Sequence, residues 1–169
     1  MTDSDDKLSM SSANGGRKAG GVMDVRGIVD AVVAAVEPLA RKKGLNVAIR
    51  CAPDLPERVM GDSRRIEQVL LELAQTAVAA TDRGFVAISA RPVAEAGALG
   101  IELLVRDTSS GPRTPGTPGE LLARALSGRL EIETGPDAGT TVRFVFPAPV
   151  ADQDGDETAT EWGGLPGRA

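Results

Sequence analysis

The chain has 169 residues, 41% of them hydrophobic and 25% charged, which suits one globular domain with short tails. It has no histidine, no tyrosine and one cysteine, Cys51, so it excludes His-ligated metal sites, Ser-His or Cys-His catalytic pairs, an internal phosphoacceptor histidine and any internal disulfide. The net charge of −5 is concentrated in residues 149–169, which leaves a nearly neutral body without the basic stripe that nucleic-acid binding needs. With no apolar run of membrane-spanning length and no signal-peptide pattern, we expect a cytoplasmic protein without nucleic-acid or membrane contacts.

Composition divides the chain into three parts. Residues 1–20 are rich in Ser, Gly and Asp and are expected to be a disordered tail, and residues 149–169 are expected to be a second, acidic disordered tail. Residues 21–148 form the predicted domain. Asp24, near its start, is a candidate helix N-cap. Apolar residues then recur at three- and four-residue steps as far as residue 40, which predicts an amphipathic helix that stops at Gly44. Alternating polarity then predicts a strand over residues 45–51.

The rest of the body alternates between helix and strand signals. Asp62 is a second N-cap candidate, and the apolar stripe behind it predicts a helix over residues 63–80. The other predicted elements are strands at 85–91 and 101–106 joined by the small-residue loop AEAGALG, a Gly/Pro-rich segment at 107–119, a short helix at 120–126, and a closing hairpin at 129–134 and 140–146. This order predicts a two-layer α/β sandwich with the helices on one face of a mixed sheet.

Four segments of the body resemble the catalytic, ATP-binding domain of sensor histidine kinases, which has the GHKL or Bergerat fold. They are DVRGIVDAVVAAVEPLARKKGLNVAIR, GDSRRIEQVLLELAQTAVAATDRGFVAISA, LLVRDTSSGP and SGRLEIETGPDAGTTVRFVFPAP. The second resembles the family's N-box helix, and the third resembles its VRDTGIG strand and turn. The resemblance implies a mostly antiparallel sheet of about five strands, covered on one face by about three helices.

The resemblance implies an adenine site around Asp107. Its carboxylate matches the family's acceptor for the adenine amino group, and Gly111 matches the glycine that lets the backbone pass close to the base. Thr141 matches the threonine or serine that supports Asp107 and the adenine base through a water. Alternatively, Asp107 caps a turn and Thr141 is an ordinary strand residue. Ser109 stands where the family usually has glycine, which predicts a more crowded turn.

The phosphate end departs further from the family pattern. Thr76 replaces the asparagine that holds Mg²⁺, and a short hydroxyl is a poor substitute for a carboxamide; Gln75, one step round the helix, is an alternative amide donor. Glu72, four residues before Thr76, resembles the catalytic glutamate, or else is a solvated carboxylate. Ala79 replaces a basic residue. The lid is short, with Arg113 as its one cation and with backbone N–H groups at Gly116 and Gly119 as candidate phosphate donors or as parts of a plain proline-turn loop.

We therefore expect an ATP-binding catalytic domain of a two-component signalling protein, with weak Mg²⁺-dependent ATPase or kinase activity. ATP and Mg²⁺ are the implied cofactors, and the implied partners are a response regulator and a phosphoacceptor histidine on another segment or chain. The alternative is a degenerate GHKL domain that binds signalling partners without using ATP. The short lid and Thr76 favour that alternative.

Overall fold

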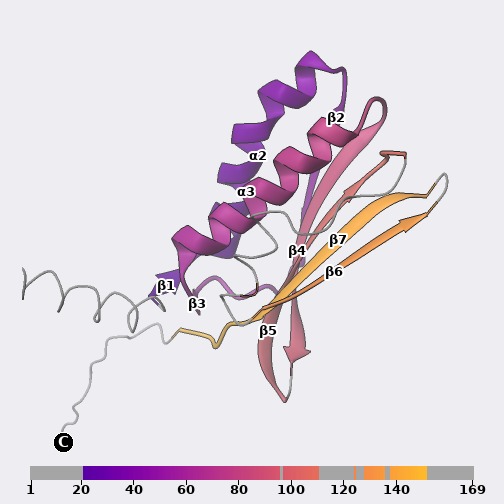
Figure 1. Ribbon diagram of the computed structural model, residues 1–169. Helices are drawn as coiled ribbons and strands as arrows, with labels where there is room; N and C mark the ends of the chain where they lie inside the picture. Colours follow the sequence, from indigo (N-terminus) through magenta and orange to yellow (C-terminus); the bar gives the residue numbers. More distant parts are fainter. Residues whose placement is uncertain (1–20, 96, 111–123, 125–127, 136–137, 152–169) are drawn as a thin grey trace, which may run out of the picture.

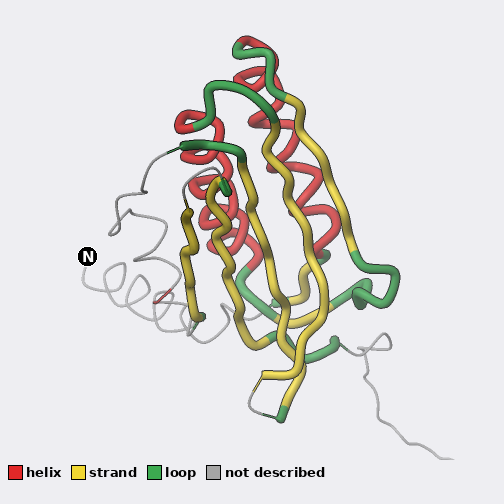
Figure 2. The backbone as a smooth tube through the Cα atoms, turned by 90° about the vertical axis from the view of Figure 1, so that its right-hand side faces the viewer, coloured by secondary structure: helices red, strands yellow, loops and turns green. Residues whose placement is uncertain are grey.

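A computed structural model describes residues 21–95, 97–110, 124, 128–135 and 138–151 of the chain. Two long helices lie side by side over one face of a sheet (Figure 1), and the view turned by 90° places the strands in front of both helices (Figure 2). The predicted two-layer sandwich is therefore confirmed with two described helices. The third predicted helix, at residues 120–126, lies outside the described residues except for Arg124.

Both helices begin at the predicted aspartates. Helix α2 spans Val25–Lys42, and the side chain of Asp24 accepts a hydrogen bond from the Gly27 backbone N–H at 3.2 Å. Helix α3 spans Ser63–Ala80, and Asp62 caps it in the same way through the Arg65 N–H. Each cap satisfies one of the N–H groups that the first turn of a helix leaves without a partner.

The main sheet has five strands in the order β2-β4-β5-β7-β6. Its strands are listed here in chain order: β2 (Asn46–Cys51), β4 (Phe85–Glu95), β5 (Ala98–Asp107), β6 (Arg129–Gly135) and β7 (Gly139–Pro147). Strands β2 and β4 are parallel, and every other neighbouring pair is antiparallel, as the resemblance implied.

The β4–β5 hairpin is longer than the sequence predicted. The prediction of a loop over residues 94–100 is wrong, because the two strands stay paired as far as Glu95 and Ala98. The ladder is formed by backbone groups, so small side chains weaken a strand without ending it.

A second sheet was not predicted. It pairs β1 (Val22–Met23) with β3 (Val59–Met60). The end of the described chain joins it, because Val150 bridges Val59 and the Met60 N–H donates to the Pro149 carbonyl at 2.7 Å. Each strand has two residues, too short for any periodic pattern, and the contacts at 149–151 lie past the domain end predicted at residue 148.

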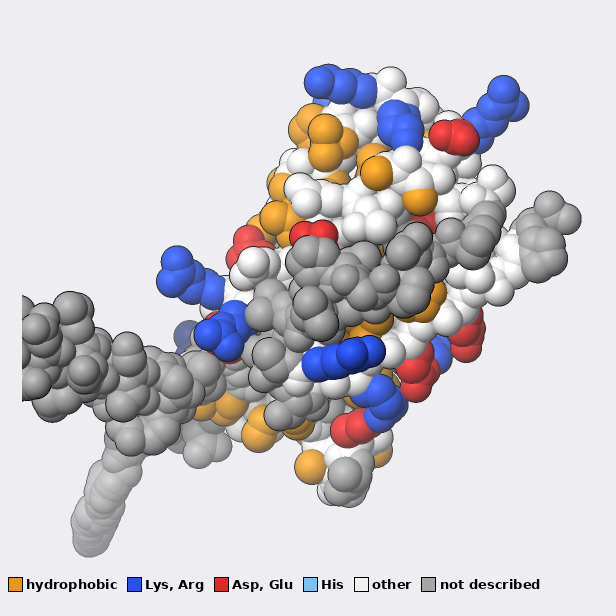
Figure 3. All heavy atoms as spheres, in the orientation of Figure 1, with side chains coloured by type: hydrophobic (Ala, Val, Ile, Leu, Met, Phe, Trp, Pro, Cys, Tyr) orange, Lys and Arg blue, Asp and Glu red, His pale blue; other side chains and the backbone are white. Residues whose placement is uncertain are grey.

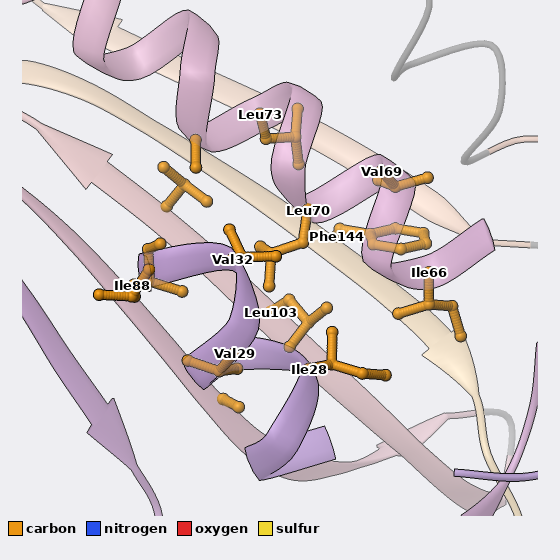
Figure 4. Close-up of a cluster of buried hydrophobic side chains, with 14 of the residues drawn as sticks. Ile28, Val29, Val32, Ile66, Val69, Leu70, Leu73, Ile88, Leu103 and Phe144 are labelled. Carbon is orange, nitrogen blue, oxygen red and sulfur yellow. The ribbon is translucent and has the colours of Figure 1, made fainter. Parts of the chain in front are cut away.

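The core lies between the helices and the sheet, and it is mostly aliphatic. Figure 4 shows side chains of both helices pointing towards those of the central strands, and the labelled residues are Ile28, Val29, Val32, Ile66, Val69, Leu70, Leu73, Ile88, Leu103 and Phe144. On β5 the odd-numbered residues are buried in this core, and on β7 the even-numbered ones are. Strand alternation therefore fixes which side chains at the strand ends face the helices.

The other face of the sheet carries ion pairs that link four strands. Glu102 on β5 is 6% exposed and lies between Arg91 on β4, at 2.6 Å, and Arg143 on β7, at 2.8 Å. The network continues through Arg143–Glu131, Arg129–Glu131 and Arg129–Glu95. In Figure 3, acidic and basic side chains lie next to one another below the place that β6 has in Figure 1. The hydrogen bond from Arg91 lowers the pKa of Glu102, and burial opposes that effect.

Candidate functional site

Asp107 is the last residue of β5, and its carboxyl group is buried. The residue is 1% exposed and continues the odd-numbered row that faces the helices. One carboxylate oxygen accepts a hydrogen bond from the Ser109 backbone N–H at 2.9 Å. This bond forms an Asx turn and fixes the orientation of a carboxylate on the face of the sheet that packs against the helices.

Two hydroxyl groups adjoin Asp107, and sequence reasoning assigned a role to neither. Thr140 on β7 lies directly opposite Asp107 in the antiparallel register, on the same face of the sheet. The Thr140 and Ser109 hydroxyl oxygens are 3.2 Å apart, and these residues are 1% and 5% exposed. Strand alternation could have found Thr140, because it shares the parity of the core residues Val142 and Phe144.

Thr141, the residue expected to support Asp107, lies on the opposite face of the sheet. It is half-buried and paired with Arg106 in the register of β5 and β7. Its parity is that of Arg143, which belongs to the ion-pair face. The structure therefore brings Thr140, and does not bring Thr141, to the face on which Asp107 lies.

Two glycines hold the turn that carries Asp107. A Cβ on Gly139, where φ is +75°, would lie 2.0 Å from the Asp107 carbonyl oxygen. A Cβ on Gly84, where φ is +108°, would lie 2.1 Å from the Thr108 hydroxyl. That hydroxyl donates to the Arg83 carbonyl at 2.7 Å and accepts from the Phe85 N–H at 3.1 Å. Both positions need glycine for its positive φ and for the close approach of the backbone.

Glu72 and Thr76 lie one turn apart on α3 and are both half-buried. The Thr76 hydroxyl donates to the Glu72 backbone carbonyl at 2.8 Å. The hydroxyl oxygen still has lone pairs that can ligate a cation. Gln75, the alternative amide, is exposed.

The end of α3 is held by a side chain from the other helix. Helix α3 has no basic residue in its last turn. The Lys43 ammonium, at the end of α2, donates to the Val78 carbonyl at 2.8 Å and to the Ala79 carbonyl at 3.0 Å. A cation at this end also opposes the negative pole of the helix dipole. Lys43 thereby links the end of α2 to the last turn of α3, just after Thr76.

Some residues of the predicted nucleotide site lie outside the described part of the chain. They are Gly111, which was expected beside the adenine base, and the phosphate candidates Arg113, Gly116 and Gly119. Over the described part of the chain, no three acidic or cysteine side chains gather in a group that could hold a metal ion. Glu72 and Thr76 are half-buried residues of α3 with oxygen-bearing side chains, one helical turn apart. Mg²⁺ is usually bound by one or two carboxylates together with substrate phosphates and water, and this pair offers one carboxylate and one neutral hydroxyl.

Comparison with solved structures identifies the fold. Full-length ShkA, in a crystal structure with AMPPNP, aligns with a TM-score of 0.67 and 23% identity over 78% of this chain and 32% of its own. The catalytic domain of the histidine kinase ThkA aligns with a TM-score of 0.61 and 22% identity, over 76% of this chain and 95% of that domain. The chain has the fold of a histidine kinase catalytic domain. Acinetobacter baumannii histidine kinase AdeS shares that fold, with a TM-score of 0.62 and 20% identity over 75% of this chain and 66% of its own.

Curated proteins similar in sequence are also histidine kinases. BarA of Escherichia coli K12 is 30% identical over 88 residues, which are 52% of this chain and 10% of BarA. Histidine kinase 3 of Arabidopsis thaliana is 26% identical over 91 residues, which are 54% of this chain and 8% of that kinase. The chain thus spans about a tenth or less of the length of these relatives. No protein-family profile matches it, and none of its described helices is long and apolar enough to cross a membrane.

Proposed function

We propose that this chain is the ATP-binding catalytic domain of a cytoplasmic, histidine-kinase-like two-component signalling protein. The observation that carries the proposal is the buried Asp107 carboxylate at the end of β5, held by the Ser109 N–H within a histidine kinase catalytic fold. A buried carboxylate needs hydrogen-bond donors, and the exocyclic amine of adenine is a donor of that kind. A base without the amine would leave the carboxylate poorly paired, which is how such a site discriminates.

The proposed phosphate end lies on α3. Mg²⁺, when bound, would neutralise phosphate charge, and Glu72 and Thr76 are the described residues that would hold it. Glu72 would also act as the general base or orient the attacking group, and Arg113 would neutralise phosphate charge from the lid. A neutral hydroxyl at position 76 and an alanine at position 79 provide little attraction for phosphate, so we expect weak binding and slow turnover.

The proposed partners follow from the chemistry of phosphoryl transfer. The chain contains no histidine, so its phosphoacceptor histidine must lie on another segment or another chain. One structural neighbour, ThkA, has been crystallised in complex with the response regulator TrrA. We propose a response regulator as the downstream partner of the present chain as well.

A second candidate function is a GHKL domain that binds signalling partners and does not use ATP. The observation that favours it is the residue at position 76. A threonine stands where the family resemblance has an asparagine, and its short neutral hydroxyl is a poor Mg²⁺ ligand. In that case the adenine end of the fold would persist without a functional phosphate end.

Titration of Mg-ATP by calorimetry separates the two functions. The wild type should show saturable binding. Asp107→Asn should abolish it, because an NH₂ donor replaces one of the two carboxylate oxygens and the negative charge is lost. Glu133→Gln, which changes an exposed carboxylate on β6, is the matched control and should bind as the wild type does. Absence of binding at millimolar ATP would contradict the catalytic proposal and favour the second function.

A further inference from the structure

Ser109 places a hydroxyl group where the family resemblance has glycine. The residue is 5% exposed, its N–H donates to the Asp107 carboxylate, and its hydroxyl oxygen is 3.2 Å from that of Thr140. One residue thus contacts both the carboxylate of the proposed adenine site and the threonine opposite it. A glycine at this position could make only the first of these contacts.

Counting hydrogens shows what the hydroxyl pair offers. Each hydroxyl has one hydrogen, and the bond between Ser109 and Thr140 uses one of the two. Over the part of the chain that the structure describes, no second side-chain partner is recorded for either hydroxyl. A buried O–H group normally has an acceptor, so the remaining hydrogen is suited to a ligand. Thr140 is the more deeply buried of the two, at 1% exposed, which makes Ser109 the outer member.

We propose that Ser109 is a specificity-determining residue whose hydroxyl donates to the ring nitrogen N1 of adenine. Thr140 donates to the Ser109 oxygen and orients it, and Asp107 accepts from the neighbouring exocyclic amine. The inference rests on the proposed ATP-binding function and deepens it. It assigns both hydrogen-bonding groups on one edge of adenine to residues of this chain.

The arrangement distinguishes adenine from guanine. Adenine presents a donor, the amine, next to an acceptor, N1, and the site presents the complementary acceptor and donor side by side. Guanine presents a carbonyl oxygen next to an N–H on the same edge. In the site, those groups would face a carboxylate and an O–H donor in the wrong order, and mismatched buried polar groups reject a ligand strongly.

The test is a cycle that combines Ser109→Ala with 1-deaza-ATP, in which a C–H group replaces N1. The wild type should bind ATP roughly fivefold more tightly than 1-deaza-ATP, as expected for one neutral hydrogen bond. Ser109→Ala should bind the two nucleotides with nearly equal affinity, and Thr140→Val should give an intermediate ratio. Ser110→Ala, which removes an exposed neighbouring hydroxyl, should keep the wild-type ratio.

The outcomes separate this inference from the proposed function. If Ser109→Ala binds ATP and keeps the fivefold preference over 1-deaza-ATP, the Ser109 assignment is overturned while ATP binding stands. If the wild type binds no ATP, both are overturned. Should Ser109→Ala lose its folded circular-dichroism spectrum, Ser109→Gly provides the same test, because it also removes the hydroxyl and suits a turn.

Discussion

At the scale of single residues, Gly139 has the least room for an added Cβ of the glycines that the structure describes. Gly139→Ala should lower the free energy of unfolding by about 1–3 kcal/mol and weaken ATP binding, because the new Cβ would collide with the Asp107 carbonyl. Urea denaturation and calorimetry measure the two effects. Gly44→Ala is the control, because Gly44 has the same φ of +75° with nothing within 4 Å of its added Cβ. Equal losses in the two variants would show that the collision has no effect.

Glu72 is the residue whose proposed role is chemical. Glu72→Ala should lower the rate of phosphate release roughly 100-fold, because a positioned general base contributes a factor of at least that size. The control, Glu67→Ala, removes an exposed carboxylate from the same helix and should not slow the reaction. A steady-state phosphate-release assay at saturating Mg-ATP checks both variants. Unchanged turnover in Glu72→Ala would remove this residue from the mechanism.

At the scale of elements, the end of α3 depends on a lysine from α2. Lys43→Met should destabilise the domain by about 1 kcal/mol, because the Val78 and Ala79 carbonyls would lose their charged donor. Lys42→Met, which changes the preceding exposed lysine, should cost less. Urea midpoints of the two variants measure the difference, and the prediction fails if Lys42→Met is the more destabilised of the pair.

The ion pairs that join the strands predict how stability depends on pH. Because the Arg91 hydrogen bond lowers the pKa of Glu102 below its ordinary value of 4.5, ionised Glu102 stabilises the fold above that value. This contribution is lost as the pH falls through the lowered pKa of the folded state. Glu102→Gln should therefore be less stable than the wild type at pH 7, and the gap should narrow below about pH 4.5. Urea denaturation between pH 3 and pH 7 tests this, and a gap that stays constant would contradict it.

How well the sequence predicts these elements depends on how local their causes are. The bounds of α3 were predicted correctly because Asp62 and an apolar stripe act within the helix itself. The β4–β5 hairpin was predicted too short because its pairing is backbone-driven and its side chains there are small. Asp107 was proposed from a motif. The parity of β7 places Thr140 on the core face, but only the register of β5 and β7 shows that it lies opposite Asp107. The roles predicted for the site residues stay predictions; these residues are Glu72, Thr76, Asp107, Gly111, Arg113 and Thr141.

At the scale of the whole molecule, β3 ties the two ends of the described chain to the domain. The Gly61 N–H donates to the Gly21 carbonyl at 2.8 Å, and the Ala151 N–H donates to the Arg58 carbonyl at 3.1 Å. Ala151 is also 4% exposed, so its side chain is buried here.

A chain that ends at residue 148 should therefore be less stable than one that ends at residue 151, by about 2 kcal/mol. The shorter chain loses the Met60–Pro149 and Ala151–Arg58 hydrogen bonds, each expected to contribute roughly 1 kcal/mol. Urea denaturation of the two truncated chains measures the difference, and both lack the acidic residues 152–169, which removes charge as an explanation. Equal stabilities would show that the second sheet is held by β1 and β3 alone. A lower free energy of unfolding in the shorter chain would place the domain boundary after Ala151, because residues 149–151 would then contribute to the stability of the fold.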